Sequence, residues 1–289
     1  QQFFTQRSIS LDNGELADLV TLRPGSELAE DFGFEELTEE TSENISLGIV
    51  YTGDSWTSTL DVYQIDIEDR IVYSGNISPT GVGTNPIDMI FAANGGAGDT
   101  LDGVANVSIF TNAADTKTRG LDWVNEWDMP LESGDSIVFE ATFHMNNTTV
   151  EKVNSASTIV SNDTVFGESN QLLLTDGQPG ERATLGATYN AAAWSLTGRA
   201  NYYGEVSTAS YGTEKKTWSA KTLFDVTGVW NVTESVQVSA GILNLFDTYP
   251  DKWGEEGGDF PALGFKYGWT SFPFSIAGRE YYVRAAVNF

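Results

Sequence analysis

The sequence predicts an all-β fold, the wall of an antiparallel transmembrane β-barrel, and three observations lead to this prediction. Apolar and polar residues alternate with a period of two over long stretches, as in strands with one dry and one wet face. Short and long connections between these stretches alternate strictly. Tyr and Trp residues stand beside the short connections. Together these features are typical of outer-membrane barrels, which have tight periplasmic turns, long external loops and aromatic rings at the membrane interface.

About nine strands follow from the alternation, and several exceed the usual length of about 5–6 residues. In the strand expected over residues 193–206, for example, Trp194 and Leu196 alternate with Ser195 and Thr197. One face is apolar and the other carries hydroxyls, amides and charges, as the wall of a water-filled lumen would. The expected strands cover residues 43–51, 56–73, 105–128, 136–149, 182–190, 193–206, 217–230, 235–246 and 278–289.

The connections separate a barrel from a β-sandwich, because a sandwich has no reason to alternate short and long links. The short turns are residues 52–55, 129–135, 190–192 and 231–235. The intervening connections, all but one of them long and all rich in Gly, Asn, Asp, Thr and Pro, are residues 74–104, 150–181, 207–216 and 247–277. We therefore expect every short turn at one end of the strands and every long loop at the other.

Aromatic residues flank the short turns, and we expect them to form a girdle at one membrane–water interface, where an amphipathic ring is favoured. The other interpretation is ordinary aromatic packing at the end of a sheet. The predicted girdle consists of Tyr51, Trp56, Trp127, Tyr189, Trp194 and Trp230.

The last strand alternates in the same way up to the terminal aromatic residue, and its dry face must meet either a protein core or lipid. We expect lipid, with a folded core as the alternative. The residues of this face are Tyr281, Val283, Ala285, Val287 and Phe289.

Composition excludes several classes of function. With 41 acidic and 15 basic residues, the formal charge of -26 argues against a nucleic-acid partner. The chain has no cysteine and no stretch near the roughly 18–20 apolar residues that a membrane helix needs. The single His144 lacks the partners of a triad or a zinc site. Acidic runs at 30–43, 126–135 and 251–259 lack EF-hand spacing. We therefore expect no catalytic residues, no cofactor and no metal.

The C-terminal region resembles TonB-dependent outer-membrane receptors. Residues 238–254 contain Asn-Leu-Phe-Asp at 244–247 and Tyr-Pro at 249–250, and residues 271–289 contain Gly-Arg-x-Tyr-Tyr before the terminal Phe. Two interior segments resemble further strands of this family, at 58–75 and 111–127.

The resemblance implies a 22-stranded barrel with an N-terminal plug domain, in the outer membrane of a Gram-negative bacterium. Such receptors import a scarce nutrient, of the siderophore, cofactor or oligosaccharide class, with energy from TonB. The implied partners are outer-membrane lipid, the barrel-assembly machinery that reads the terminal strand, TonB acting through a plug, and the remainder of the barrel. Nine strands cannot close such a barrel, so we expect residues 1–289 to be the C-terminal part of the β-barrel domain, without the plug and the early strands. Residues 1–8 resemble the outer end of an upward strand.

Two alternatives stay open. One is a small, complete outer-membrane porin or adhesin of about ten strands, with residues 3–11 as the extra strand. The other is a secreted carbohydrate-binding β-sandwich that uses the loop aromatics Trp253, Tyr267 and Trp269.

Overall fold

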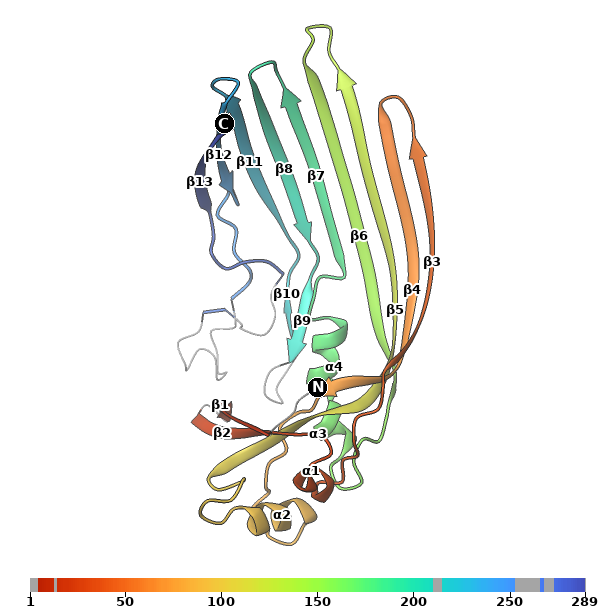
Figure 1. Cartoon of the computed structure of the whole chain (residues 1–289), viewed down its shortest axis with the longest axis vertical. Helices are drawn as coiled ribbons and strands as arrows, with labels where there is room; N and C mark the ends of the chain where they lie inside the picture. The colour runs from red at the N-terminus through yellow and green to blue at the C-terminus, as the bar shows by residue number, and fades with distance from the viewer. Residues whose placement is uncertain (1–4, 13–14, 210–214, 253–265, 268–272, 289) are drawn as a thin grey trace.

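A tall curved sheet, capped at one end by short helices, makes up the protein (Figure 1). It is described by a computed structural model that covers residues 5–12, 15–209, 215–252, 266–267 and 273–288. All nine predicted strands are confirmed. They are β3 (Thr41–Thr52), β4 (Trp56–Tyr73), β5 (Val104–Pro130), β6 (Ser136–Val153), β7 (Glu181–Asn190), β8 (Trp194–Tyr203), β11 (Lys221–Asn231), β12 (Val236–Leu243) and β13 (Glu280–Val287).

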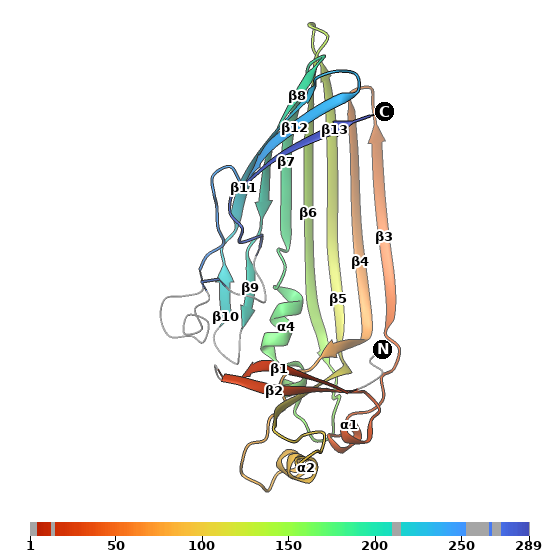
Figure 2. The ribbon, with the colours of Figure 1, turned by 60° about the vertical axis from the view of Figure 1, so that its left-hand side comes forward.

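These strands form one antiparallel wall in chain order, from β3 at one margin to β13 at the other. Figure 2 shows the wall curving, with β12 and β13 crossing in front of the middle strands. Within the described residues the wall is a single layer, so the β-sandwich alternative is wrong. It also does not close on itself, because β13 pairs only with β12 and β3 only with β4.

The ends of the strands segregate as predicted. The four short turns and the end of β13 lie together at the top of Figure 1, and the described parts of the long connections lie at the opposite end. In the turn between β5 and β6, the Leu131 N–H donates to the Asp135 carbonyl at 2.9 Å, and Gly134 adopts a φ of 88° that only glycine tolerates well. We call these two ends the short-turn end and the long-loop end.

The long-loop end carries a cap that the sequence analysis did not predict. Residues 6–12 do not continue a barrel strand as we expected for residues 1–8; they form a hairpin in which β1 (Gln6–Asp12) pairs with β2 (Glu15–Leu22). β2 then runs parallel to the first residues of β5. The hairpin forms because it buries the apolar side chains Val20 and Leu22 of β2 beneath the wall. The helices of the cap are α1 (Glu27–Asp31), α2 (Pro86–Asn94), α3 (Asn162–Phe166) and α4 (Glu168–Thr175).

The buried apolar side chains gather in this cap. Phe32 and Phe91 meet edge to face, with ring centroids 5.8 Å apart, and Val107, Ile109 and Val165 pack in the same cluster. The wall itself has no comparable core, because a single layer leaves both faces uncovered. The part of the chain that the structure describes therefore combines a small globular core at the long-loop end with a wall whose apolar face is left uncovered by the other described residues.

Local capping signals explain the helices. Asn85 caps α2 by accepting a hydrogen bond from the Asp88 N–H, and Pro86 occupies its first turn. Ser161 caps α3 by accepting from the Thr164 N–H. Among the residues described, no helix is long and apolar enough to cross a membrane.

A bend separates the wall from the cap. The register of β4 shifts between Ile67 and Arg70, and Asp69 adopts a left-handed φ of 53°. The carboxylate of Asp115 accepts from the Asp69 N–H at 3.0 Å, and Asn112 Nδ2 donates to the Asp69 carbonyl at 2.6 Å. This bulge satisfies the backbone groups that leave the ladder where the strands turn toward the cap.

Beyond the wall, β8 and β11 continue into a small separate sheet. It consists of β9 (Val206–Ala209) and β10 (Lys215–Trp218), which pair antiparallel. The Trp218 side chain is fully buried there. This two-stranded sheet stands beside α4 and completes the surroundings of the site described next.

Candidate functional site

The pairing register gives the wall two chemically distinct faces. Directly paired residues lie on the same face, and the chain of pairs from Trp56 through Trp127 and Phe139 ends at Ile242 and Tyr281. We call this the outer face. Residues at the alternate positions form the inner face.

The six predicted girdle residues lie together on the outer face, near the short-turn end. The rings of Tyr51 and Trp56 are 4.9 Å apart, those of Tyr189 and Trp194 stack at 5.3 Å, and Trp194 pairs with Trp230 across the ladder. The four tryptophans are 45–56% exposed. The arrangement matches a girdle, and its contact with a membrane interface stays a prediction.

The terminal strand continues the outer face. Tyr281, Val283, Ala285 and Val287 are exposed and pair with Ile242, Ala240, Val238 and Val236 of β12, which carry the same apolar chemistry. Phe289 lies outside the described residues. That these side chains face lipid and serve assembly is likewise still a prediction.

The apolar band of the outer face ends at a polar belt. On β4 and β5 the belt consists of Gln64, Asp66, Lys117 and Arg119. Lys117 Nζ lies 3.1 Å from Asp66, and Arg119 Nε donates to Gln64 Oε1 at 2.8 Å. This belt lies beyond the apolar band on the side of the long loops.

The inner face is mainly polar, with single apolar residues such as Val124 and Val138 among its polar side chains. Arg199 pairs with Glu140 at 3.1 Å, and Asn201 donates to Asp225 at 2.7 Å. The single histidine, His144, is hydrogen-bonded through Nδ1 to Asp122, so it belongs to this face and to no catalytic triad among the described residues. A face of paired charges and amides suits a wet interior.

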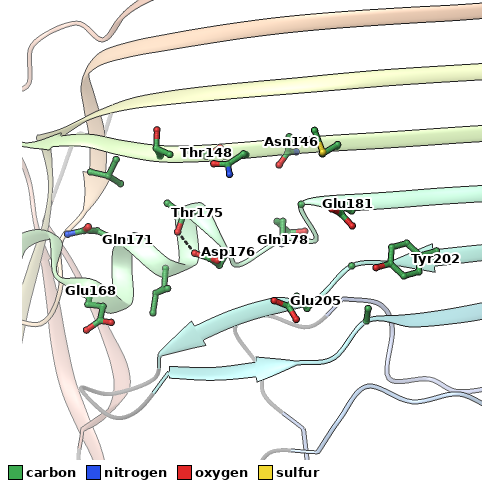
Figure 3. A pocket seen from close by; sticks show the side chains of 18 residues that line it. Asn146, Thr148, Glu168, Gln171, Thr175, Asp176, Gln178, Glu181, Tyr202 and Glu205 are labelled. Carbon is green, nitrogen blue, oxygen red and sulfur yellow. Dashed lines mark hydrogen bonds between the residues drawn. The ribbon is translucent and has the colours of Figure 1, made fainter.

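A large cavity opens where β6 extends beyond the end of β7. The two strands are paired only as far as Met145 and Glu181. Beyond that pair, β6 continues to Val153, while α4 and β9 occupy the space where a neighbouring strand would lie (Figure 3). The break is held by backbone bonds, since the Asn146 N–H donates to the Gly180 carbonyl at 2.7 Å and the Ser207 N–H to the Asp176 carbonyl at 2.8 Å.

The cavity has a volume of about 900 Å³, and its lining combines polar and acidic groups with the apolar residues Met145, Val150, Leu172 and Ala220. Among the described residues of this lining, the charged ones are the carboxylates Glu168, Asp176, Glu181 and Glu205. Amides and hydroxyls supply the rest of its hydrogen-bonding groups, with Asn146, Asn147, Thr148, Gln171, Gln178 and Tyr202 among them. Two cations lie beside the lining: Lys215 Nζ is 4.0 Å from Asp176, and Arg182 donates to Gln178 at 3.4 Å.

This lining can bind neutral hydroxyl-rich groups or cations. Amide and hydroxyl side chains donate and accept hydrogen bonds, whereas carboxylates accept only. Among the described residues no three carboxylate or imidazole groups converge on a point that could hold a metal ion. The four acids therefore act as separate acceptors around the cavity, and the sum of their charges disfavours an anionic ligand.

Sequence reasoning missed this cavity because it treated residues 150–181 as a plain loop. A local signal was present: Ser161 stands three residues before Thr164, and Gly167 precedes the apolar run of α4. Such caps predict helices, but they do not predict that a helix replaces a strand in the wall.

Comparisons with known proteins agree with the geometry. A family model described as TonB dependent receptor-like, beta-barrel matches residues 10–245. A search of curated protein sequences finds no match.

Among solved structures, the chain is similar in fold to a copper transporter, OprC, with 17% identity and a TM-score of 0.55 over 88% of this chain and 32% of that one. A mutant of the ferric enterobactin receptor PfeA from Pseudomonas aeruginosa matches with 17% identity and a TM-score of 0.55 over 96% and 33%. The siderophore receptor PirA from Acinetobacter baumannii matches with 14% identity and a TM-score of 0.54 over 99% and 35%. The chain thus spans about a third of the length of the solved receptors that it matches.

Proposed function

Since the chain belongs to the TonB-dependent receptor β-barrel family, we propose that it forms part of an outer-membrane receptor, and not an enzyme, that imports a scarce nutrient into a Gram-negative bacterium. The observation that carries the proposal is the pairing of an apolar outer face with a polar inner face on one wall. A wall of this kind separates lipid from a wet interior.

The remainder of the barrel is the first partner in this proposal. β3 and β13 are margins of the described sheet, and each leaves a row of backbone donors and acceptors without a ladder. Within hydrocarbon every such group costs several kcal/mol, which is why barrels close. Together with the one-third coverage of solved receptors, this supports residues 1–289 as the C-terminal part of the barrel, with the plug and the early strands outside this chain.

Lipid, the assembly machinery and TonB are the other proposed partners. The girdle and the terminal strand would contact outer-membrane lipid, and the apolar positions of β13 would be read by the barrel-assembly machinery. TonB would act through the plug domain. Each of these interactions rests on the family and on the exposure of the outer face.

The cavity favours one kind of nutrient within the siderophore, cofactor and oligosaccharide classes. An anionic ligand would have to approach four carboxylates that have two neighbouring cations, Lys215 and Arg182. A cationic siderophore complex would be attracted, and a neutral oligosaccharide would find amide and hydroxyl partners. We therefore propose a ligand that is cationic or uncharged and rich in hydroxyl or carbonyl groups.

Uptake by cells that produce the full receptor tests both parts of the proposal. Import of a cationic ferric siderophore, an anionic ferric catecholate and a neutral oligosaccharide would be compared in cells with and without TonB. We expect import that requires TonB and excludes the anionic probe. Import that persists without TonB would contradict the receptor function, whereas TonB-dependent import of the anionic probe alone would contradict only the ligand class.

A charge-neutralising pair of variants links the result to the cavity. Glu181→Gln keeps the shape of the side chain and removes its charge, and an exposed ion pair contributes up to about 1 kcal/mol, so affinity for a cationic ligand should fall about two- to five-fold. Glu132→Gln, in a turn at the short-turn end, is the matched control and should leave affinity unchanged. Equal effects of both substitutions would place the ligand elsewhere.

A further inference from the structure

An amide on the apolar outer face has a donor without an acceptor. Asn125 lies on β5 between Trp123 and Trp127 at the same-face positions, opposite Ser58 on β4 and Ala141 on β6. The Nδ2 atom of Asn125 is buried and has no hydrogen-bond partner among the described residues. A buried donor without a partner is costly, and such a group in a folded protein calls for an explanation.

The orientation of this amide is fixed by a neighbour. The indole Nε1 of Trp56 lies 3.3 Å from Asn125 Oδ1. An indole N–H can only donate, so the atom that accepts must be the amide oxygen. Exchanging the two amide atoms would set donor against donor, and therefore the orphan group is the N–H.

The amide lies in an aromatic groove that opens on the outer face. The groove has a volume of about 450 Å³ and is lined mainly by Trp56, Trp123, Trp127, Phe139 and Ala141 around Asn125. The three indoles are 44–51% exposed, and Trp123 Nε1 already donates to Ser58 Oγ at 3.1 Å. The described residues that line the groove include Glu140 but no Lys or Arg, so they offer no cationic partner for a phosphate.

The depth of the Asn125 amide below the aromatic girdle matches the depth of one lipid group, the ester carbonyl. Asn125 is two residues from the girdle residue Trp127 on the side away from the turn, which is about 7 Å along the strand. Ester carbonyls of a phospholipid lie just inside the interface that Trp and Tyr occupy. A carbonyl oxygen is an uncharged acceptor, and thus complements a lone N–H in an apolar groove.

We propose that this groove binds a diacyl phospholipid of the periplasmic leaflet. One acyl chain lies along the indoles, and an ester carbonyl accepts a hydrogen bond from Asn125 Nδ2. The half-exposed indoles cover the amide, and a small rotation of Trp123 or Trp127 uncovers it. The site is independent of the nutrient cavity, which lies near the long-loop end.

The test compares two lipids that differ only in the proposed acceptor. The full receptor would be reconstituted with equal amounts of dioleoyl phosphatidylethanolamine and its diether analogue, which lacks both ester carbonyls. Lipids retained on release from the bilayer would be counted by native mass spectrometry. One neutral hydrogen bond corresponds to about a three- to ten-fold preference, so we expect the ester lipid to be retained in that excess.

Two variants assign the preference to this amide. Asn125→Leu keeps the approximate shape and removes the donor, and it should abolish the preference. Gln64→Leu is the control: Gln64 is an amide of the same face, but it already donates to Asp66 at 2.6 Å and accepts from Arg119, so its loss should leave the preference intact.

Either of two outcomes would overturn the proposal. Equal retention of the two lipids by the unaltered receptor would show that no ester carbonyl is recognised, and this result needs no variant to fold. A preference that survives in Asn125→Leu would show that the acceptor is recognised elsewhere. Folding of each variant would be verified by the heat-dependent gel mobility of the intact barrel.

Discussion

Gly198 offers a direct measurement of what the outer face touches. It lies on β8 and pairs with Ala187 and Val226, two other outer-face residues. A side chain at this position would meet no atom within 4 Å of its Cβ, so a substitution tests the surroundings without a clash. Gly198 is four residues from Trp194, about 13 Å along the strand and about 10 Å in depth at a tilt near 40°. In a bilayer whose interface lies at Trp194, the position would therefore be close to the middle.

We expect Gly198→Arg to destabilise the folded receptor by about 2–4 kcal/mol, the cost of an arginine near the bilayer midplane. That is about a 30- to 800-fold loss in the folding equilibrium constant. Gly198→Leu fills the same space with an apolar group and should be neutral or stabilising. Thr197→Arg adds the same charge one residue away on the inner face, where Arg199 already lies, and should cost well under about 1 kcal/mol beyond the loss of the Thr188 hydrogen bond.

The measurement is the fraction of full receptor that folds into phospholipid vesicles as urea is diluted. Lipid at the outer face predicts that the folded fraction is highest for Gly198→Leu, lower for Thr197→Arg and lowest for Gly198→Arg. If both arginine variants fold equally well, or if the Thr197 variant is the worse, the faces have been assigned wrongly or the solvent is not lipid.

Three further predictions concern groups outside the membrane-spanning part. Burial raises the pKa of Asp88, but hydrogen bonds from the Gly83 and Thr80 N–H groups and from the Thr80 hydroxyl outweigh burial and hold that pKa below its usual value. The ionised carboxylate therefore stabilises the cap fully above the pKa of the unfolded state, and this stability is lost as the pH falls. Proteolysis within residues 79–84 should increase on acidification, and in Asp88→Asn it should be high at every pH. Burial also opposes ionisation of Asp251, yet Lys221 and Ser219 hold its pKa at about 2. Because this carboxylate is 36% exposed, it should contribute only about 1 kcal/mol to the free energy of unfolding above pH 4, and this contribution should be lost toward pH 2. Urea titrations of Asp251→Asn should not show that loss. Asp69 has a φ of 53°, so Asp69→Val should cost about 1–2 kcal/mol of thermal stability while Asp69→Gly costs less, and equal losses would contradict a strained bulge.

The strands were predictable from sequence because a period of two repeats over many residues. On β6, Phe139 and Phe143 alternate with Glu140 and His144, and no helical spacing competes with that signal. The order of the strands followed from the alternating connections. Both features are local in the sequence, so they can be recognised without knowledge of the rest of the fold.

The cap and the cavity depend instead on distant contacts. α2 has nine residues and α3 only five, too few turns to show a helical stripe, and the helices are held by packing against β2 and the first part of β5. The cavity arises because β6 reaches Val153 whereas its partner begins at Glu181. A difference in length between two paired strands depends on both strands, so no pattern within one segment of the sequence predicts it.

The polar belt sets how deep the protein sits. On β5 the apolar band runs from Trp127 to Leu121, six residues or about 20 Å along the strand, and less than that in depth once the strand is tilted. Arg119, bonded to Gln64, occupies the next outer-face position, and the Lys117–Asp66 pair follows at the one after it. In a bilayer with the usual core of about 30 Å, this ion pair would be drawn into hydrocarbon, and the membrane would have to thin around it or the wall would have to tilt further. If the outer face contacts lipid, the wall would therefore be matched to a thin membrane, and bilayer thickness would select where the wall is stable and how far its cap stands above the surface.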